Sequence, residues 1–81
     1  MNVKVLFFAT MRERTGIRDI ILDIPEGTAV ADFKKLLVQQ YPGLAAAMSS
    51  VLVAVNKEFA FDEQIILDKS EIAVFPPVSG G

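Results

Sequence analysis

The last two residues of the chain, Gly80 and Gly81, have the types and the position that could do chemistry. They end a segment that begins with Pro76 and Pro77, and prolines remove backbone donors and favour an extended exit from a folded body. The six residues 76–81 could reach about 20 Å at roughly 3.3 Å per residue. An arm that ends without side chains can enter a channel too narrow for a Cβ atom and present its terminal carboxylate to another protein's active site.

The carboxylate of Gly81 is a weak nucleophile and a worse acyl electrophile, so an outside enzyme would have to activate it. The simplest route is attack of the carboxylate on the α-phosphate of ATP to give an acyl-adenylate. ATP would then be consumed by that partner, and we expect no cofactor bound to this chain. The competing interpretation is that a Gly-Gly end is a frayed and chemically idle terminus.

The composition argues against chemistry by side chains. The sequence of 81 residues contains no cysteine, histidine or tryptophan. Disulfides, thiol nucleophiles, imidazole acid–base catalysis and Cys/His metal sites are therefore excluded. We expect a single small domain that holds no metal and is not an enzyme on its own.

The charge pattern argues against nucleic acid and membrane as partners. The net charge is −2 and the eight Lys and Arg residues are scattered, whereas phosphate binding needs a concentrated basic face. The longest charge-free stretch, residues 36–56, is interrupted by Gln, Pro, Gly and Ser and is better explained by a helix end, a loop and a strand. The first residues show no signal peptide, which favours a cytoplasmic protein.

Alternating apolar residues predict two strands at the start of the chain. Over residues 3–10, Val3, Val5 and Phe7 should face the core, while Leu6 and Phe8 share the outward face with a lysine. A polar break over residues 12–16 follows, in which Arg12, Glu13 and Arg14 form a solvated turn and Gly16 supplies a positive φ. Residues 17–24 should then form an antiparallel strand with Ile20, Leu22 and Ile24 inside.

One amphipathic helix is predicted in the middle of the chain. Thr28 is a plausible N-cap, Asp32 lies in the first turn, and the Pro42-Gly43 pair ends the helix. Its apolar stripe recurs at spacings of three and four and consists of Val30, Phe33, Leu36, Leu37 and Tyr41. Beyond it we expect a helical turn over 44–48, a buried strand over 51–56, short pieces over 59–61 and 65–67, a polar turn over 68–71 and a last strand over 72–75.

This order of elements predicts an α+β domain over residues 1–75 and a projecting tail over 76–81. A mixed sheet of four to five strands with one main helix packed across it resembles the β-grasp fold of ubiquitin. A ferredoxin-like fold is the alternative for a chain of this size, but it needs a second full helix, and none is indicated after Met48.

The whole chain resembles a known family, the small subunit of molybdopterin synthase. The resemblance rests on the opening VKVLFFA with Arg12, Glu13 and Gly16 after it, on VAVN ending at Asn56, and on the closing FPPVSGG, which is the most specific motif. It implies a ubiquitin-like sulfur carrier whose terminal glycine is adenylated by an E1-like enzyme and converted to a thiocarboxylate. The tail would then enter the large catalytic subunit, in a heterotetramer, and donate sulfur to cyclic pyranopterin monophosphate for molybdenum or tungsten cofactor synthesis.

Carried over residue by residue, the resemblance gives Gly81 the thiocarboxylate and Gly80 the clearance in the partner's channel. The chain departs from the family at the turn Asp68-Lys69-Ser70-Glu71, where the family often has Asp-Gly-Asp-Glu. A residue other than glycine at Lys69 puts the geometry of this turn in doubt, but not the chemistry of the tail.

The apolar residues left outside the core suggest a docking surface. Hydrophobic residues make up 52% of the chain, more than a domain of this size can bury. The first and last strands of a β-grasp sheet are adjacent, so Phe8 and Phe75 should form one patch beside the tail, with Leu6 and Phe59. The remaining phenylalanines, Phe7, Phe33 and Phe61, are expected in the core.

Three other functions stay open on the sequence. The same activated Gly81 could form isopeptide bonds, as in a ubiquitin-like protein modifier. The chain could carry sulfur for thiazole synthesis, although those carriers are usually shorter and lack the Phe-Pro-Pro segment. It could also be an interaction domain with an inert tail.

Overall fold

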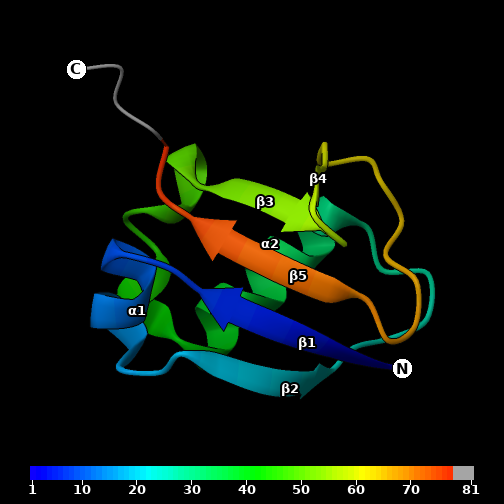
Figure 1. The fold of residues 1–81 in the computed structure, drawn as a ribbon, viewed down its shortest axis with the longest axis horizontal. Coiled ribbons are helices and arrows are strands. Elements are labelled where there is room, and N and C mark those ends of the chain that lie inside the picture. Colours follow the sequence, from blue (N-terminus) through cyan, green and yellow to red (C-terminus); the bar gives the residue numbers. More distant parts are fainter. Residues whose placement is uncertain (78–81) are drawn as a thin grey trace.

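The fold is a five-stranded mixed sheet with helices on one side, seen in a computed structural model that describes residues 1–77 (Figure 1). The strands are β1 (Asn2–Phe7), β2 (Asp19–Asp23), β3 (Leu52–Val55), β4 (Glu58–Phe59) and β5 (Glu71–Phe75). Their order across the sheet is β2-β1-β5-β3-β4. The central pair β1–β5 is parallel and the other pairs are antiparallel. The predicted β-grasp arrangement is confirmed.

The alternation predicted for the first two strands is confirmed. Val3, Val5 and Phe7 of β1 are buried, whereas Leu6 is half-buried and Phe8, just beyond the strand, is exposed. The second strand is shorter than the predicted 17–24 but pairs antiparallel with β1 as expected. Its inward positions are half-buried or buried, and they are Ile20, Leu22 and, just past its end, Ile24.

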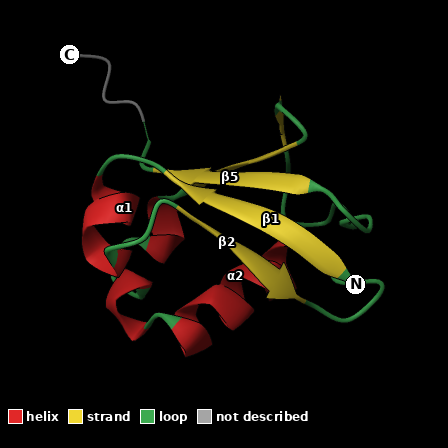
Figure 2. Ribbon diagram, turned by 60° about the horizontal axis from the view of Figure 1, so that its bottom comes forward, coloured by secondary structure: helices red, strands yellow, loops and turns green. Residues whose placement is uncertain are grey.

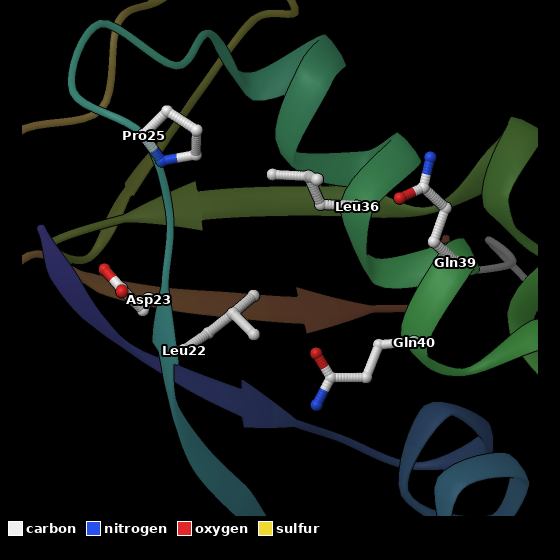
Figure 3. A pocket seen from close by; sticks show the side chains of 6 residues that line it. All are labelled: Leu22, Asp23, Pro25, Leu36, Gln39 and Gln40. Atoms are coloured by element: carbon white, nitrogen blue, oxygen red, sulfur yellow. The ribbon is translucent and has the colours of Figure 1, made fainter.

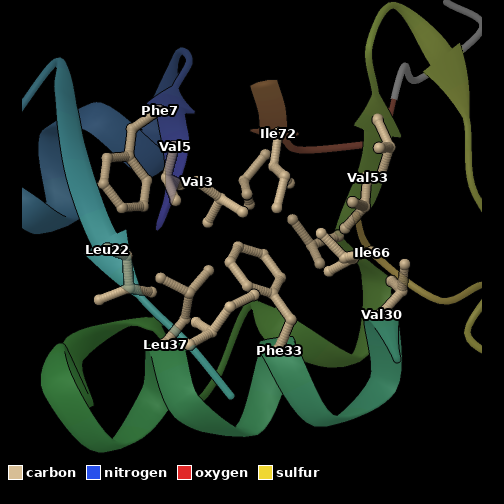
Figure 4. Close-up of a cluster of buried hydrophobic side chains, with 14 of the residues drawn as sticks. Val3, Val5, Phe7, Leu22, Val30, Phe33, Leu37, Val53, Ile66 and Ile72 are labelled. Atoms are coloured by element: carbon tan, nitrogen blue, oxygen red, sulfur yellow. The ribbon is translucent and has the colours of Figure 1, made fainter. Parts of the chain in front are cut away.

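The main helix, α2 (Val30–Gln40), lies across one face of the sheet (Figure 2). Its stripe packs as predicted, with Val30, Phe33 and Leu37 fully buried. Figure 3 shows Leu36 and Gln40 of the helix facing β2 across a groove. The core lies between helix and sheet, where apolar side chains of both layers meet (Figure 4).

The predicted N-cap at Thr28 is wrong. The capping position of α2 is Ala29, and the buried Thr28 hydroxyl donates instead to the carbonyl of Pro25. The helix needs no side-chain cap because its first N–H groups have backbone acceptors in the loop before β5. The amides of Val30 and Ala31 donate to the carbonyls of Gln64 and Asp62, at 2.9 and 3.0 Å.

The polar break predicted over residues 12–16 is a short helix, α1 (Thr10–Thr15). Met11 is its only buried residue, so the segment lacks the apolar periodicity that would have indicated a helix. Gly16 has the expected positive φ of 72°, but as the left-handed C-cap of α1. Arg12, Glu13 and Arg14 are exposed, as predicted for a solvated segment.

The second half of the chain contains shorter elements than predicted. The turn expected over 44–48 is two 3-10 helices, η1 (Pro42–Leu44) and η2 (Met48–Ser50). The strand predicted over 51–56 forms β3, but it is buried on one face only, since Leu52 and Ala54 are half-buried. The piece predicted over 65–67 is not a strand and makes one isolated bridge, between Ile65 and Ala29.

The turn at Asp68–Glu71 keeps a geometry that suits glycine although it carries Lys69. Lys69 has a φ of 63°, in the left-handed region that side chains disfavour. Its amide donates to the carbonyl of Asn2 at 2.7 Å, and the Asp68 carboxylate accepts from the Asn2 amide at 3.0 Å. These bonds join the turn to the start of β1, so the departure from the family pattern leaves the turn intact.

Among residues 1–77, no helix has the length and apolarity needed to span a membrane.

Candidate functional site

Three exposed or half-buried phenylalanines form a cluster on the face of the sheet opposite α2. The rings of Phe8 and Phe75 meet edge to face, with centroids 6.5 Å apart. The rings of Phe59 and Phe75 are tilted, with centroids 5.9 Å apart. Phe8 is 41% exposed and Phe59 is 71% exposed. The rings of Phe8, Phe59 and Phe75 thus lie together as one aromatic cluster. Such exposed aromatic residues are typical of a surface that binds another protein, and that role stays a prediction.

The strand register explains how residues so far apart in the sequence meet. Leu6 lies opposite Ala73 in the parallel β1–β5 pair, and the Phe8 amide donates to the Val74 carbonyl at 3.1 Å. Phe59 lies opposite Ala54 in the β3–β4 pair. Small residues at 54 and 73 therefore occupy the centre of this face, and larger apolar side chains surround them.

Leu52 belongs to the same surface and was missed from the sequence. It lies opposite Phe75 in the β3–β5 pair and is half-buried. The signal was present, because Val53 and Val55 alternate with Leu52 and Ala54 along the strand. Leu6, which was predicted, is also half-buried on this face.

A tight turn after β1 fixes the position of Phe8. The Met11 amide donates to the Phe8 carbonyl at 3.0 Å, which closes a β-turn over residues 8–11. Ala9 occupies the second position of the turn with φ 49° and ψ −126°, a type II′ geometry in which glycine is the usual residue. The Arg12 Nε donates to the Phe7 carbonyl at 3.4 Å, which places Arg12 beside this end of the cluster. The turn thus holds the Phe8 ring against Phe75 at a cost in backbone strain.

The tail leaves the domain directly from this surface. Phe75 is the last residue of β5, and Pro76 follows it immediately. Pro76 is half-buried and Pro77 is exposed. The predicted reactive residue Gly81 and its neighbour Gly80 lie outside the described residues. A partner seated on the aromatic cluster would therefore meet the first residues of the tail.

Two further expectations concern residues away from the cluster. Phe61, which was predicted to be in the core, is 79% exposed. The prediction fails because residues two apart in an extended segment lie on the same side, so Phe61 follows the outward Phe59, and β4 has already ended at Phe59. Within the described part of the chain, no group of three or more acidic side chains lies close enough to hold a metal ion.

Comparison with known proteins decides the family. A family model described as the ThiS family matches residues 5–81, which includes the closing Gly-Gly. The chain belongs to this family. Its curated relatives include a molybdopterin synthase sulfur carrier subunit of Arabidopsis thaliana, which is 38% identical over 81 residues, with 100% of this chain and 84% of the relative covered. A human protein of the same name is 35% identical over 83 residues, with 99% of this chain and 94% of the relative covered.

Solved structures confirm the fold of this ThiS-family protein. The small archaeal modifier protein 1 of Haloferax volcanii has a TM-score of 0.86 and 26% identity, with 95% of this chain and 98% of that chain covered. A ubiquitin of Caldiarchaeum subterraneum has a TM-score of 0.66 with 10% identity, over 100% of this chain and 98% of that chain, which supports the ubiquitin-like fold alone. The resemblance to the small subunit of molybdopterin synthase that the sequence indicated is thus confirmed at the level of the family.

Proposed function

We propose that this protein is the sulfur carrier subunit of a molybdopterin synthase and that Gly81 carries the sulfur. The observation that supports the proposal most strongly is that relatives named as such subunits match the chain over its full length. The aromatic cluster at the base of the tail supplies a surface on which partner enzymes can dock. The relatives' shared name also favours this function over sulfur carriage for thiazole synthesis.

The proposed chemistry is confined to the main-chain terminus. The Gly81 carboxylate attacks the α-phosphorus of ATP on an E1-like enzyme, which forms an acyl-adenylate and releases pyrophosphate. Sulfide (HS−) delivered by a sulfur donor then attacks the acyl carbon, AMP leaves with the bonding electron pair, and a thiocarboxylate remains once the S–H proton is lost. The thiocarboxylate sulfur attacks a side-chain carbon of cyclic pyranopterin monophosphate and displaces the oxygen substituent of that carbon, and water then cleaves the resulting acyl–sulfur bond. The sulfur stays on the pterin, and the Gly81 carboxylate is regenerated.

The folded body has a binding function in this scheme. The aromatic cluster would dock first on the activating enzyme and then on the large catalytic subunit, since both must hold the domain while the tail reaches their active sites. Each round delivers one sulfur, whereas a dithiolene needs two. After the first transfer the spent carrier must therefore leave and a loaded carrier must take its place. This requires an interface that releases as well as binds.

Intact-mass spectrometry tests the proposal. The protein, coexpressed with an E1-like activating enzyme and a sulfur source, should gain the mass difference between sulfur and oxygen. The Gly81→Ala variant should stay unmodified, because a Cβ at the reacting residue obstructs entry into the channel. Ser79→Ala is the matched control and should still be loaded. Failure of the unaltered chain to acquire sulfur under any condition would contradict the proposal.

Protein modification is the second candidate function, because a solved structure similar to this chain is called a modifier protein. In that function Gly81 would form isopeptide bonds with lysines of other proteins. A tryptic digest of cells that express the protein would then contain lysines that carry residues 70–81 as a branch, because Lys69 is the last tryptic site before the Gly-Gly end. Such branches that disappear when Gly81 is deleted would favour modification, and sulfur loading without branches would favour the carrier.

A further inference from the structure

The strand β2 lies at one edge of the sheet with half of its backbone groups turned outward. Hydrogen bonds from the Phe7 amide to the Arg18 carbonyl and from the Ile24 amide to the Met1 carbonyl set the ladder to β1. In an antiparallel pair only alternate residues bond the neighbouring strand. The even-numbered residues of β2 therefore face β1, and the N–H and C=O groups of Asp19, Ile21 and Asp23 point away from the sheet. In the described chain no other strand pairs with them.

A groove runs beside this edge, between β2 and α2. Its volume is about 320 Å³. Figure 3 shows the six residues that line it, which are Leu22, Asp23, Pro25, Leu36, Gln39 and Gln40. Leucine side chains from the strand and the helix give it an apolar floor, and two glutamine amides form its rim. An added strand would project every second side chain into this groove, because side chains alternate between the two faces of a sheet.

The charges near the β2 edge are mainly negative and favour a ligand that carries basic residues. None of the six residues that line the groove is cationic. Asp19 and Asp23, the latter also bordering the groove, flank Ile21, which is 66% exposed. Lys4 lies opposite Ile21 in β1, and the terminal amine of Met1 contacts Asp23 at 3.3 Å, yet the Asp23 side chain remains 84% exposed. Both aspartates can therefore accept a further cation.

A second copy of the chain fits this edge poorly. If two β2 strands paired antiparallel around Ile21, each Asp19 would lie directly opposite an Asp23 of the other copy. Like charges in directly opposed cross-strand positions are destabilising. A partner strand that carries lysine or arginine at the two positions opposite Asp19 and Asp23 would instead be attracted by the two carboxylates.

We propose that β2 and the adjoining groove bind an extended segment of a partner protein, which pairs with the Asp19–Asp23 edge, inserts apolar side chains between β2 and α2, and places basic residues beside the two aspartates. Backbone pairing with an exposed sheet edge is a general mode of peptide recognition, in which alternate side chains provide the specificity. The aromatic cluster is not used in this contact. The backbone pairing is at the β2 edge, whereas Phe75 and Phe59 of the cluster lie on β5 and β4, beyond β1.

A designed peptide tests the proposal. The probe is a fluorescein-labelled peptide with the core Lys-Val-Val-Val-Lys, whose two lysines would lie opposite Asp23 and Asp19. We expect saturable binding by fluorescence polarisation and, in ¹⁵N-resolved NMR spectra, shifts of the Asp19, Ile21 and Asp23 amides. N-methylation of the central valine removes the donor opposite Ile21 and should weaken binding about tenfold. A Glu-Val-Val-Val-Glu core should not bind.

Two variants and one control probe the edge from the protein's side. Ile21→Pro removes an outward N–H that has no partner in the sheet, and should weaken binding about tenfold. Asp19→Lys, which leaves the backbone unaltered, should weaken it about fivefold. Glu58→Lys makes the same charge change in β4, at the other edge of the sheet, and should leave binding unaltered.

Three outcomes would overturn the proposal. One is no saturable binding of the lysine peptide to the unaltered protein. Another is binding whose NMR shifts centre on Phe8 and Phe75, and the third is equal binding of the N-methylated and unmodified peptides. Dimerisation of the free protein through β2, seen by analytical ultracentrifugation and abolished by Ile21→Pro, would assign the edge to a second copy instead.

Discussion

Replacing Ala9 with glycine should make the protein more stable, although the change removes a side chain. Ala9 adopts φ 49° and ψ −126° at the second position of the turn that closes on the Phe8 carbonyl. This conformation is open to glycine, whereas the Cβ of alanine makes it unfavourable. The side chain at position 9 is exposed, so its removal leaves no cavity.

The expected gain is the difference between two opposing effects. Strained backbone conformations of this kind cost about 1–3 kcal/mol, and glycine relieves that cost. Glycine also makes the unfolded chain more flexible, which lowers stability by about 0.4–1 kcal/mol. The net result is about 1 kcal/mol in favour of Ala9→Gly, or a rise of about 4–8 °C in the unfolding midpoint of a domain this size.

Thermal and urea unfolding followed by circular dichroism measure this gain. The matched control is Gly16→Ala at the other end of α1, where φ is 72° and a new Cβ would meet no atom within 4 Å. It should lose about 1 kcal/mol from backbone strain alone. If Ala9→Gly lowered stability while Gly16→Ala behaved as expected, the strain assigned to the turn at Phe8 would be refuted.

Three further predictions follow from the cluster, the turn before β5 and the core. Phe75→Asp should weaken binding to the activating enzyme and to the large subunit by about 2 kcal/mol, or roughly thirtyfold in calorimetric titrations, whereas Phe61→Asp, an exposed aromatic outside the cluster, should leave both affinities unchanged. Lys69→Gly should raise the free energy of unfolding by about 0.5–1 kcal/mol, because φ is 63° at this position, and the midpoint of urea unfolding should rise with it. Phe33→Ala should cost about 3–5 kcal/mol, since the ring is fully buried, and a cooperative calorimetric transition at the original midpoint would contradict this.

The parts of the fold that repeat regularly were predictable from the sequence. In β1 every second residue is apolar and buried, so the outward positions of Leu6 and Phe8 followed from counting alone. The helical stripe from Val30 to Leu37 was equally clear, because three- and four-residue spacings have no other common explanation. The adjacency of the first and last strands came from the resemblance to the β-grasp fold.

The errors concern segments whose structure is decided by distant partners. Thr28 is a good N-cap by residue type, but backbone carbonyls of the loop over residues 62–64 satisfy the helix instead. Helix α1 has one buried residue and no stripe, so no local pattern could indicate it. Phe61 resembles a core residue by composition, yet it lies two residues after the outward Phe59, on the side of the segment that faces solvent.

The position of β5 has a consequence for how the protein is made. This strand lies between β1 and β3, and it is synthesised after the other four strands. Until it emerges, the β1–β2 pair and the β3–β4 pair have no hydrogen-bonded connection in the sheet, and the slow long-range pairing that joins them must wait. A prematurely terminated chain would lack both the central strand and the residues after it. Completion of the sheet and formation of the aromatic cluster are therefore coupled, because β5 supplies both the central strand and the Phe75 ring.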